Sequence, residues 1–227
     1  MKKFNNLALF DLDNTLIPSD SDHLWTEFLV ENKIISKLNT EISDRFFAEY
    51  SNGTLNLEEF LDYQLQPLKE IGNKRLLGLR SIFIEKKIRP VINTEAIELV
   101  SSHLQSGDLC AIVTATNEFI TEPIAKLFNV HKLIATLVEK NEYGAYTGKS
   151  YGVPSFREGK IIRVNEWLKG NGLSLNSFKK SFFYSDSFND IPLLKIVNNP
   201  VATNPDKKLK EYAVRNNWRV INIFKDV

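Results

Sequence analysis

Two aspartates spaced two residues apart, Asp11 and Asp13, directly follow the apolar run LALF near the start of the chain. A second acidic pair, Asp186 and Asp190, follows the run SFFYS. Carboxylates that cluster in this way repel one another unless a cation holds them together. Because oxygen ligands without a Cys/His set suit a hard divalent ion, we expect these side chains to bind Mg²⁺.

These carboxylates can meet only if the strands before them end at the same edge of a sheet. Four short apolar runs have the length of β-strands: Leu7 to Phe10, Leu109 to Val113, Ser181 to Tyr184 and Val220 to Phe224. Helical patterns separate them at Asn93 to Gln105, Glu118 to Phe128 and Lys160 to Lys169. This alternation predicts an α/β fold, with a Rossmann-like, doubly wound and mostly parallel sheet. Ligands bind such a sheet beyond the carboxyl ends of its strands.

Residues 18–88 interrupt the alternation, because they contain no good strand pattern. Four amphipathic helical patterns occur there: Leu24 to Val30, Ile34 to Tyr50, Leu57 to Leu68 and Lys74 to Ile88. The segment is too long for a loop. We therefore expect a helical cap domain at 18–88, inserted after the first strand into a catalytic core formed by residues 1–17 and 89–227.

The composition excludes several classes of protein. Twenty-nine basic and 28 acidic residues leave a net charge of +1, which provides no field for binding nucleic acid or a membrane surface. The one cysteine, Cys110, excludes an internal disulfide and a multi-cysteine metal site. No apolar stretch has the length of a membrane span, and the N-terminus makes a poor signal peptide. We expect a cytoplasmic protein that is a monomer or a homodimer.

Four motifs in sequence order resemble those of the haloacid dehalogenase superfamily. They are DLDNT from Asp11, the strand AIVT ending at Thr114, the lysine of EGKIIRV at Lys160, and SDSFND with Asp186 and Asp190. The helical insertion after the first motif and the TG turn before Lys160 resemble the phosphoserine-phosphatase-like branch, subfamily IB. The resemblance covers essentially the whole chain.

This resemblance implies a phosphomonoesterase with an aspartyl-phosphate intermediate. Asp11 would be the nucleophile, and Asp13 would be the general acid and then the general base. Mg²⁺ would bind Asp11, Asp186 and the main-chain carbonyl of Asp13, with Asp190 ordering metal-bound water.

The resemblance also implies how the phosphoryl oxygens are held. Lys160 would pair with them, and Thr114 and the following backbone N–H, at Ala115, would bind the others. Asn189 would help to order the phosphate site.

The residues of the cap indicate which substrate to expect. In the phosphoserine phosphatases of this branch, an acidic residue after the first motif holds the amino group of the substrate, and a cap arginine holds its carboxylate. Here Asp20 matches the acid, whereas Gln64 stands where the arginine is expected. This favours a phosphate ester with an amine and no carboxylate, such as histidinol phosphate. Phosphoserine remains the alternative if Arg45, Arg75 or Arg80 supplies the missing cation.

Residues at and just before the start of the first cap helix have alternative roles. Asp20 or Asp22 would hold the amine, or both would cap the helix that begins near Leu24. Trp25, or Phe28, would stack on an imidazole, or Trp25 would belong to the core of the cap.

Two other classes compete with an enzyme. A signalling receiver domain also gathers an acidic pair, a phosphoacceptor Asp, a Thr and a Lys at a sheet edge. It has no helical insertion after the first strand and no counterpart of Asp13. An inactive binding protein on the same fold is the other alternative, which the intact motifs disfavour.

Overall fold

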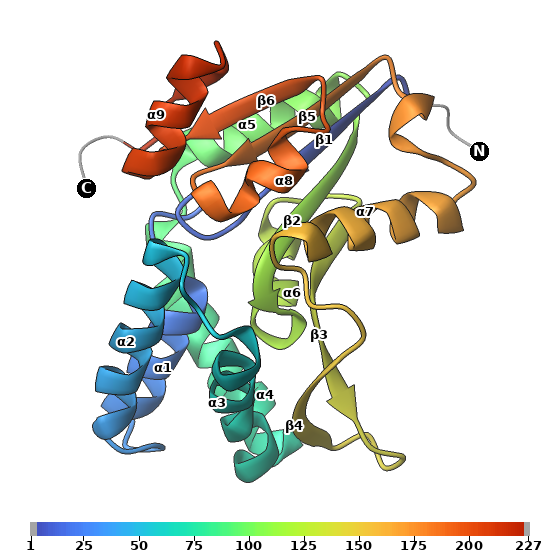
Figure 1. Ribbon diagram of the computed structural model, residues 1–227. Helices are drawn as coiled ribbons and strands as arrows, with labels where there is room; N and C mark the ends of the chain where they lie inside the picture. Colours follow the sequence, from blue (N-terminus) through green and yellow to red (C-terminus); the bar gives the residue numbers. More distant parts are fainter. Residues whose placement is uncertain (1–3, 225–227) are drawn as a thin grey trace.

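The computed structural model describes residues 4–224, and a seven-stranded sheet forms its centre (Figure 1). The strand order is β4-β3-β2-β1-β5-β6-β7, and every neighbouring pair is parallel except β3 and β4. The strands are β1 (Asn6–Phe10), β2 (Leu109–Asn117), β3 (Lys132–Lys140), β4 (Tyr146–Tyr151), β5 (Lys180–Ser185), β6 (Asn199–Thr203) and β7 (Arg219–Ile221). The predicted α/β, doubly wound and mostly parallel sheet is confirmed.

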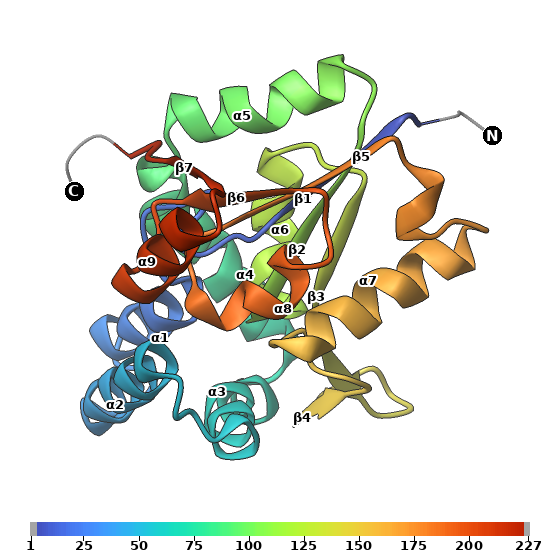
Figure 2. The same ribbon diagram turned by 45° about the horizontal axis from the view of Figure 1, so that its top comes forward.

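Helices cover both faces of the sheet (Figure 2). They are α5 (Thr94–Gln105), α6 (Glu118–Leu127), α7 (Glu158–Gly170), α8 (Ile191–Leu194) and α9 (Lys207–Arg215). Alternate residues of β1 point to opposite faces. Leu7 and Leu9 pack in a cluster with α7, α8 and α9, and Ala8 and Phe10 pack in a cluster with α5 and α6. β1 is therefore buried on both sides in the middle of the sheet.

The inserted segment is helical and lies at the sheet edge where β1 ends (Figure 1). Its helices are α1 (Ser21–Glu31), α2 (Leu38–Asn52), α3 (Leu57–Ile71) and α4 (Asn73–Phe83), followed by a π-helical turn (Ile84–Ile88). Trp25, Phe28 and Phe83 belong to the same hydrophobic cluster as Phe10 on the sheet. The insertion thus shares a core with one face of the sheet. The domain boundaries at 17/18 and 88/89 stay a prediction.

Helix α6 contains Pro123 and begins at Glu118, with Asn117 as its N-cap. The sequence leaves open whether Pro123 kinks this helix or marks its first turn, and the second alternative is wrong. A proline cannot donate to the carbonyl four residues earlier, which is that of Phe119. Arg80 of α4 donates to this carbonyl from Nη1 at 2.7 Å. The proline therefore creates an acceptor that ties the insertion to the core.

The sequence patterns do not predict β3 or β6. The stretch YGAYTG, from Tyr143 to Gly148, is typical of a short hairpin turn, but the turn in the structure lies earlier in the chain. The observed turn joins Asn141 to Ala145, and Gly148 lies within β4. Gly148 has φ +80°, and a Cβ there would lie 3.1 Å from Cβ of Lys69 on α3. Glycine at this position allows α3 to pack closely on the β3–β4 hairpin. Among residues 4–224, no helix is long and apolar enough to cross a membrane.

Candidate active site

The site begins at the carboxyl ends of β1, β2 and β5, which are adjacent in the sheet. Phe10 of β1 pairs with Ile112 of β2 and with Tyr184 of β5. Asp11 follows directly, and its backbone N–H donates to the carbonyl of Tyr184 at 2.8 Å. The side chain of Asp11 is buried, at 6% exposure, and lines a cavity beneath the inserted helices. β1 lies at the point where the chain order changes direction, which is where such sheets bind ligands.

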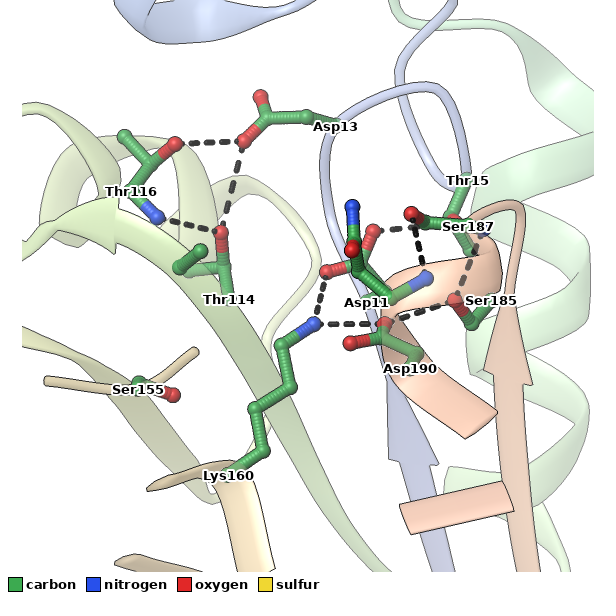
Figure 3. Close-up of polar contacts among 12 residues, drawn as sticks. Asp11, Asp13, Thr15, Thr114, Thr116, Ser155, Lys160, Ser185, Ser187 and Asp190 are labelled. Atoms are coloured by element: carbon green, nitrogen blue, oxygen red, sulfur yellow. Dashed lines mark hydrogen bonds and ion pairs between the residues drawn. The ribbon is translucent and has the colours of Figure 1, made fainter. Parts of the chain in front are cut away.

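Lys160 reaches this edge from the first turn of α7. Its Nζ lies 2.7 Å from Oδ1 of Asp11 and 2.7 Å from Oδ2 of Asp190, with the side chain almost fully buried (Figure 3). Burial alone lowers the pKa of Lys160, but the charges of Asp11 and Asp190 raise it above its ordinary value. The lysine therefore stays protonated and supplies one fixed positive charge beside Asp11.

Gly159 makes this placement of Lys160 possible. A Cβ at Gly159 would lie 2.0 Å from the carbonyl oxygen of Pro154, so any other residue would push α7 away from the loop before it. The glycine of EGK is thus a packing requirement of the site.

Asp190 contacts Lys160 and Ser185 at the end of β5. Besides Nζ of Lys160, its Oδ2 accepts a hydrogen bond from Oγ of Ser185 at 2.7 Å. Burial is the largest cause that raises the pKa of Asp190, to about 6, and the charge of Lys160 opposes it. The predicted role of Asp190 in ordering metal-bound water stays a prediction, but its observed contacts orient the lysine.

The hydroxyl of Thr15 lies between the carboxylates of Asp11 and Asp186. Its Oγ1 lies 3.2 Å from Oδ2 of Asp11 and 3.1 Å from Oδ1 of Asp186, and it accepts a hydrogen bond from the backbone N–H of Asp186. One hydroxyl proton cannot serve both carboxylates at once. Burial, then the charges of Asp11 and Asp190, raises the pKa of Asp186 well above its ordinary value. These two oxygens therefore form a place where a cation would relieve repulsion.

The donor set fits Mg²⁺ better than a metal held by a complete protein cage. Within residues 4–224, no group of three His, Cys, Asp or Glu side chains is arranged to hold an ion. Mg²⁺ typically uses one or two carboxylates and takes its other ligands from water and substrate phosphate. Asp11 and Asp186 would provide the carboxylates, and the main-chain carbonyl of Asp13 a third oxygen. The side chain of Asp13 points elsewhere.

Asp13 lies on the opposite side of the site from Lys160, among hydroxyl groups of β2 (Figure 3). Its Oδ2 accepts from Oγ1 of Thr116 at 2.8 Å and from Oγ1 of Thr114 at 3.4 Å. Its Oδ1 accepts from the backbone N–H of Ser21 at 2.8 Å, at the start of α1. Burial, then the charge of Asp20, raises the pKa of Asp13 to about 6. A carboxyl group with such a pKa is suited to accepting and donating protons near neutral pH.

The cavity extends from these carboxylates into the inserted helices and holds about 710 Å³ of empty space, its open mouth included. Sites for small molecules typically have about 300–1,000 Å³. The lining residues from the insertion are Asp20, Asp22, His23, Ser43, Phe46, Phe47, Tyr50, Leu55, Leu57, Phe60 and Gln64. Of the predicted phosphate-site residues, Thr114 and Ala115 line it. The described lining contains five aspartates and no lysine or arginine.

Of the two aspartates at the start of α1, Asp20 has the predicted capping role, and binding of an amine by Asp20 or Asp22 stays a prediction. Asp20 is the N-cap of α1, where its Oδ1 accepts from the backbone N–H of His23 at 2.8 Å. Asp22 is buried inside the first turn, and its Oδ1 accepts from Nε2 of Gln64 at 2.9 Å and from Nδ2 of Asn117 at 3.0 Å. Both line the cavity, and Asp22 joins α1 to α3 and to the end of β2.

Two predicted ligand-binding residues occupy other places. Trp25 is 1% exposed and packs against Phe28, Phe83 and Phe119, and it does not line the cavity. The predicted stacking of Trp25 or Phe28 on a substrate ring is therefore corrected, because both rings fill the shared core. Phenylalanines of α2 and α3 line the cavity instead.

Asn189 lies outside the cavity lining, at a contact between the core and α2. Its Oδ1 accepts from Nη2 of Arg157 at 3.1 Å, and its Nδ2 donates to the carbonyl of Tyr50 at 2.9 Å. Both ends of the amide are thus engaged, so direct binding of phosphate by Asn189 is not supported by its observed contacts.

Sequence reasoning misses several functional positions. Thr116 and Asn117 lie in a continuation of β2 that the apolar run ending at Val113 does not reveal. The cavity-lining face of α2 carries Phe46, Phe47 and Tyr50, and only the amphipathic pattern of that segment could have pointed to it.

Comparisons with known proteins agree with this geometry. Residues 8–195 match the model of the haloacid dehalogenase-like hydrolase family. A histidinol-phosphatase from Neisseria meningitidis serogroup C is 42% identical over 218 residues, which cover 96% of this chain and 98% of that protein. A phosphoserine phosphatase from Mycobacterium tuberculosis is 32% identical over 219 residues, which cover 94% of this chain and 69% of that protein.

Solved structures show the same fold. The crystal structure of a protein of unknown function from Bordetella pertussis Tohama I has a TM-score of 0.92 and 44% identity, with 97% of this chain and 100% of that chain covered. A phosphoserine phosphatase solved as a phospho-aspartyl intermediate analogue has a TM-score of 0.67 and 22% identity, with 99% and 96% covered. At that identity, the second likeness concerns the fold alone.

Proposed function

The chain belongs to the haloacid dehalogenase-like hydrolase family, and from this we propose that it is a Mg²⁺-dependent phosphomonoesterase that acts through an aspartyl-phosphate on Asp11. The observation that carries the proposal is the position of this carboxylate. It is buried at the end of β1, with Nζ of Lys160 2.7 Å from Oδ1 and the carboxylate of Asp186 on the other side of Thr15. This arrangement offers a nucleophile with positive charge beside it.

The reaction would proceed in two steps at this carboxylate. Bound at Asp11 and Asp186, Mg²⁺ would supply positive charge that offsets the repulsion between the carboxylate and the phosphate. An oxygen of Asp11 attacks phosphorus, the bond to the ester oxygen breaks, and Asp13 gives its proton to the leaving alkoxide. Lys160 and Thr114 hold phosphoryl oxygens in place.

In the second step, Asp13 takes a proton from a water molecule, whose oxygen attacks phosphorus. The bond between phosphorus and Asp11 breaks, which releases inorganic phosphate and restores the carboxylate. Asp13 can act in both steps because the hydroxyls of Thr114 and Thr116 and the first turn of α1 fix it near the reacting oxygen positions.

For the substrate we favour a small phosphate ester that carries an amine and no carboxylate, with histidinol phosphate as the first candidate. The described cavity lining has no lysine or arginine to neutralise a carboxylate. Asp20 and Asp22 provide negative charge, and Phe46, Phe47 and Phe60 provide aromatic surface. The 42% identical relative named histidinol-phosphatase supports the same choice.

Phosphoserine is the second candidate, and the relative named phosphoserine phosphatase favours it. It requires a cation for the carboxylate of the substrate. Arg80 is engaged with the carbonyl of Phe119, and Arg45 lies over the ring of Phe46 with its side chain more than half exposed. Neither of these arginines nor Arg75 lines the cavity.

A panel of phosphate esters tests both parts of the proposal. Histidinol phosphate, phosphoserine, phosphoethanolamine, sugar phosphates and an aryl phosphate are each assayed for phosphate release, with Mg²⁺ and with a chelator. We expect Mg²⁺-dependent release that is fastest with histidinol phosphate. Absence of release from every ester would contradict the proposed activity, and preference for phosphoserine would contradict only the substrate.

A further inference from the structure

Tyr50, on the last turn of α2, lines the cavity together with Asp11 and Asp186. Burial, then the charges of Asp190, Asp11 and Asp186, raises the pKa of its phenol well above the ordinary value, and a hydrogen bond with the side chain of Ser187 lowers it. The side chain of this cap residue therefore lines the same cavity as two carboxylates of the core. The two-step reaction described above gives it no role.

The end of α2 is attached to the core by hydrogen bonds to its last carbonyls. The carbonyl of Tyr50 accepts from Nδ2 of Asn189 at 2.9 Å. The carbonyl of Gly53 accepts from Nη2 of Arg157 at 2.8 Å, and that of Asn52 accepts from Nζ of Lys208 at 3.0 Å.

Two of these donors are cations at the negative end of a helix, which is a favourable arrangement. In Figure 1, α2 rises toward the sheet and ends beside it. The core therefore sets the position of the last turn of α2, and with it the position of Tyr50.

Phe156 supports the Tyr50 ring from the loop before α7. The centroids of the two rings lie 5.8 Å apart, and both side chains line the cavity. Since the ring and the backbone of Tyr50 are both held, little side-chain entropy would be lost when its hydroxyl contacts a bound substrate.

A phosphoryl group on Asp11 needs hydrogen-bond donors around its oxygens. Lys160 approaches Asp11 from α7, and Thr114 lies in β2, two residues beyond Ile112, the last residue that pairs with β1. Tyr50 approaches from the cap, where its protonated phenol is a hydrogen-bond donor. Three donors from three different elements would then surround the transferred group.

We infer that Tyr50 is a catalytic residue whose phenol donates a hydrogen bond to the phosphoryl group as it is transferred to and from Asp11. The inference rests on the proposed function. It means that the inserted helices take part in the chemistry as well as in the selection of the leaving group.

Tyr50→Phe removes only the hydroxyl and tests this inference. We expect kcat to fall by about 10- to 100-fold, as for loss of one hydrogen bond to a charged group, with KM within about threefold of the wild type. Orthovanadate, which resembles the pentacoordinate phosphoryl group, should bind more weakly by a similar factor in a fluorescence titration.

Tyr63→Phe is the matched control. Tyr63 is the cap tyrosine of α3, its hydroxyl donates to the carbonyl of Asn39 at 2.6 Å, and it does not line the cavity. Its replacement should lower the melting temperature but leave kcat and vanadate binding close to those of the wild type. If Tyr50→Phe lowers the melting temperature but leaves kcat and vanadate binding close to those of the wild type, its effect is purely structural. That outcome would overturn the inference.

The choice of substrate separates contact with phosphate from contact with the leaving group. The loss caused by Tyr50→Phe should be the same, within about threefold, for an aryl phosphate and for an amine-bearing ester. A loss confined to one substrate would overturn the inference. If the wild type hydrolyses phosphate esters and Tyr50→Phe does so equally well, the inference fails and the proposed function stands. If the wild type hydrolyses none, both fail.

Discussion

Nε2 of Gln64 lies 2.9 Å from Oδ1 of Asp22, so a neutral amide and a buried carboxylate face each other across α3 and α1 at the cavity wall. The amide donates to one oxygen of Asp22 and carries no charge of its own that could pair with a carboxylate. The electrostatic character of this wall therefore depends on the neutral residue at position 64.

Gln64→Arg should weaken the preference for a cationic leaving group. In the wild type, we expect kcat/KM for histidinol phosphate to exceed that for phosphoserine by at least about tenfold, which corresponds to about 1.4 kcal/mol. An arginine at position 64 would pair with Asp22 and narrow this ratio. Gln66→Arg, on the exposed side of the same helix, is the control and should leave the ratio unchanged. A wild-type enzyme that prefers phosphoserine would contradict the account of the cavity wall.

Asp22→Asn should stabilise the protein in a pH-dependent way. Burial, then the charges of Asp20 and Asp13, raises the pKa of Asp22 well above its ordinary value of 3.8. A carboxyl group whose pKa is higher in the folded state destabilises that state above the unfolded-state pKa. The penalty grows as the pH rises, until the folded-state pKa is passed.

Asparagine keeps the oxygen that accepts from both Gln64 and Asn117. The difference in melting temperature between Asp22→Asn and the wild type should therefore be small near pH 4 and positive at pH 7. Each unit of pKa shift corresponds to about 1.4 kcal/mol, and each kcal/mol to roughly 2–4 °C. Asp62→Asn, on the exposed face of α3, should change little at either pH. A melting temperature that falls in Asp22→Asn at pH 7 would contradict this view of Asp22.

Mg²⁺ should affect stability as well as activity, through Asp186. Activity should vanish with a chelator and return with Mg²⁺, and Mg²⁺ should raise the melting temperature of the wild type because it binds the folded state. Asp186→Asn should abolish this thermal shift. It should also make the metal-free protein more stable, since one of two repelling buried carboxylates is gone. Full activity in a chelator, or an unchanged thermal shift in Asp186→Asn, would exclude the proposed metal site.

Arg157→Ala should act through Tyr50. Loss of the hydrogen bond from Arg157 to the carbonyl of Gly53 loosens the end of α2, so we expect kcat to fall by less than about tenfold. In the double variant Arg157→Ala/Tyr50→Phe, kcat should be close to that of Tyr50→Phe alone. Arg157→Ala acts only by displacing the Tyr50 hydroxyl, which Tyr50→Phe has already removed. Arg163→Ala, in the same helix as Lys160 but bonded to the carbonyl of Val153, is the control. Losses that multiply in the double variant would show that Arg157 acts independently of Tyr50.

The central strands and the residues directly after them could be predicted from the sequence, because a strand buried on both faces is a short apolar run and its polar successor lies at the sheet edge. This reasoning places Asp11 and Asp186 correctly after neighbouring strand ends. Thr114 lines the same cavity, although its strand continues to Asn117. The same reasoning does not find β6, because the run NPVAT is short and contains Pro200. In the structure, Pro200 nevertheless pairs with Phe183 of β5.

The cap could be predicted as helical but not in its contacts. Its helices bury some residues against the sheet face and others against the cavity. An amphipathic pattern alone does not say whether the apolar face of a helix packs on the sheet or lines the cavity. The sequence favours the core over the cavity for Trp25 without excluding either, and the observed packing against Phe83 and Phe119 places it in the core. Tyr50 lies far from every motif in the sequence, and the position of the end of α2 brings it into the cavity that the carboxylates line.

The central claim is that Asp11 carries the phosphoryl group, and mass spectrometry after a rapid acid quench tests it most directly. An aryl phosphate has a good leaving group, so it should phosphorylate the Asp13→Asn variant, in which loss of the general base slows hydrolysis by about 10²- to 10⁴-fold. The account predicts that the peptide containing Asp11 gains the mass of one phosphoryl group in Asp13→Asn and gains none in Asp11→Asn, which should be inactive. Near-normal turnover by Asp11→Asn, or phosphorylation of a different residue, would contradict it.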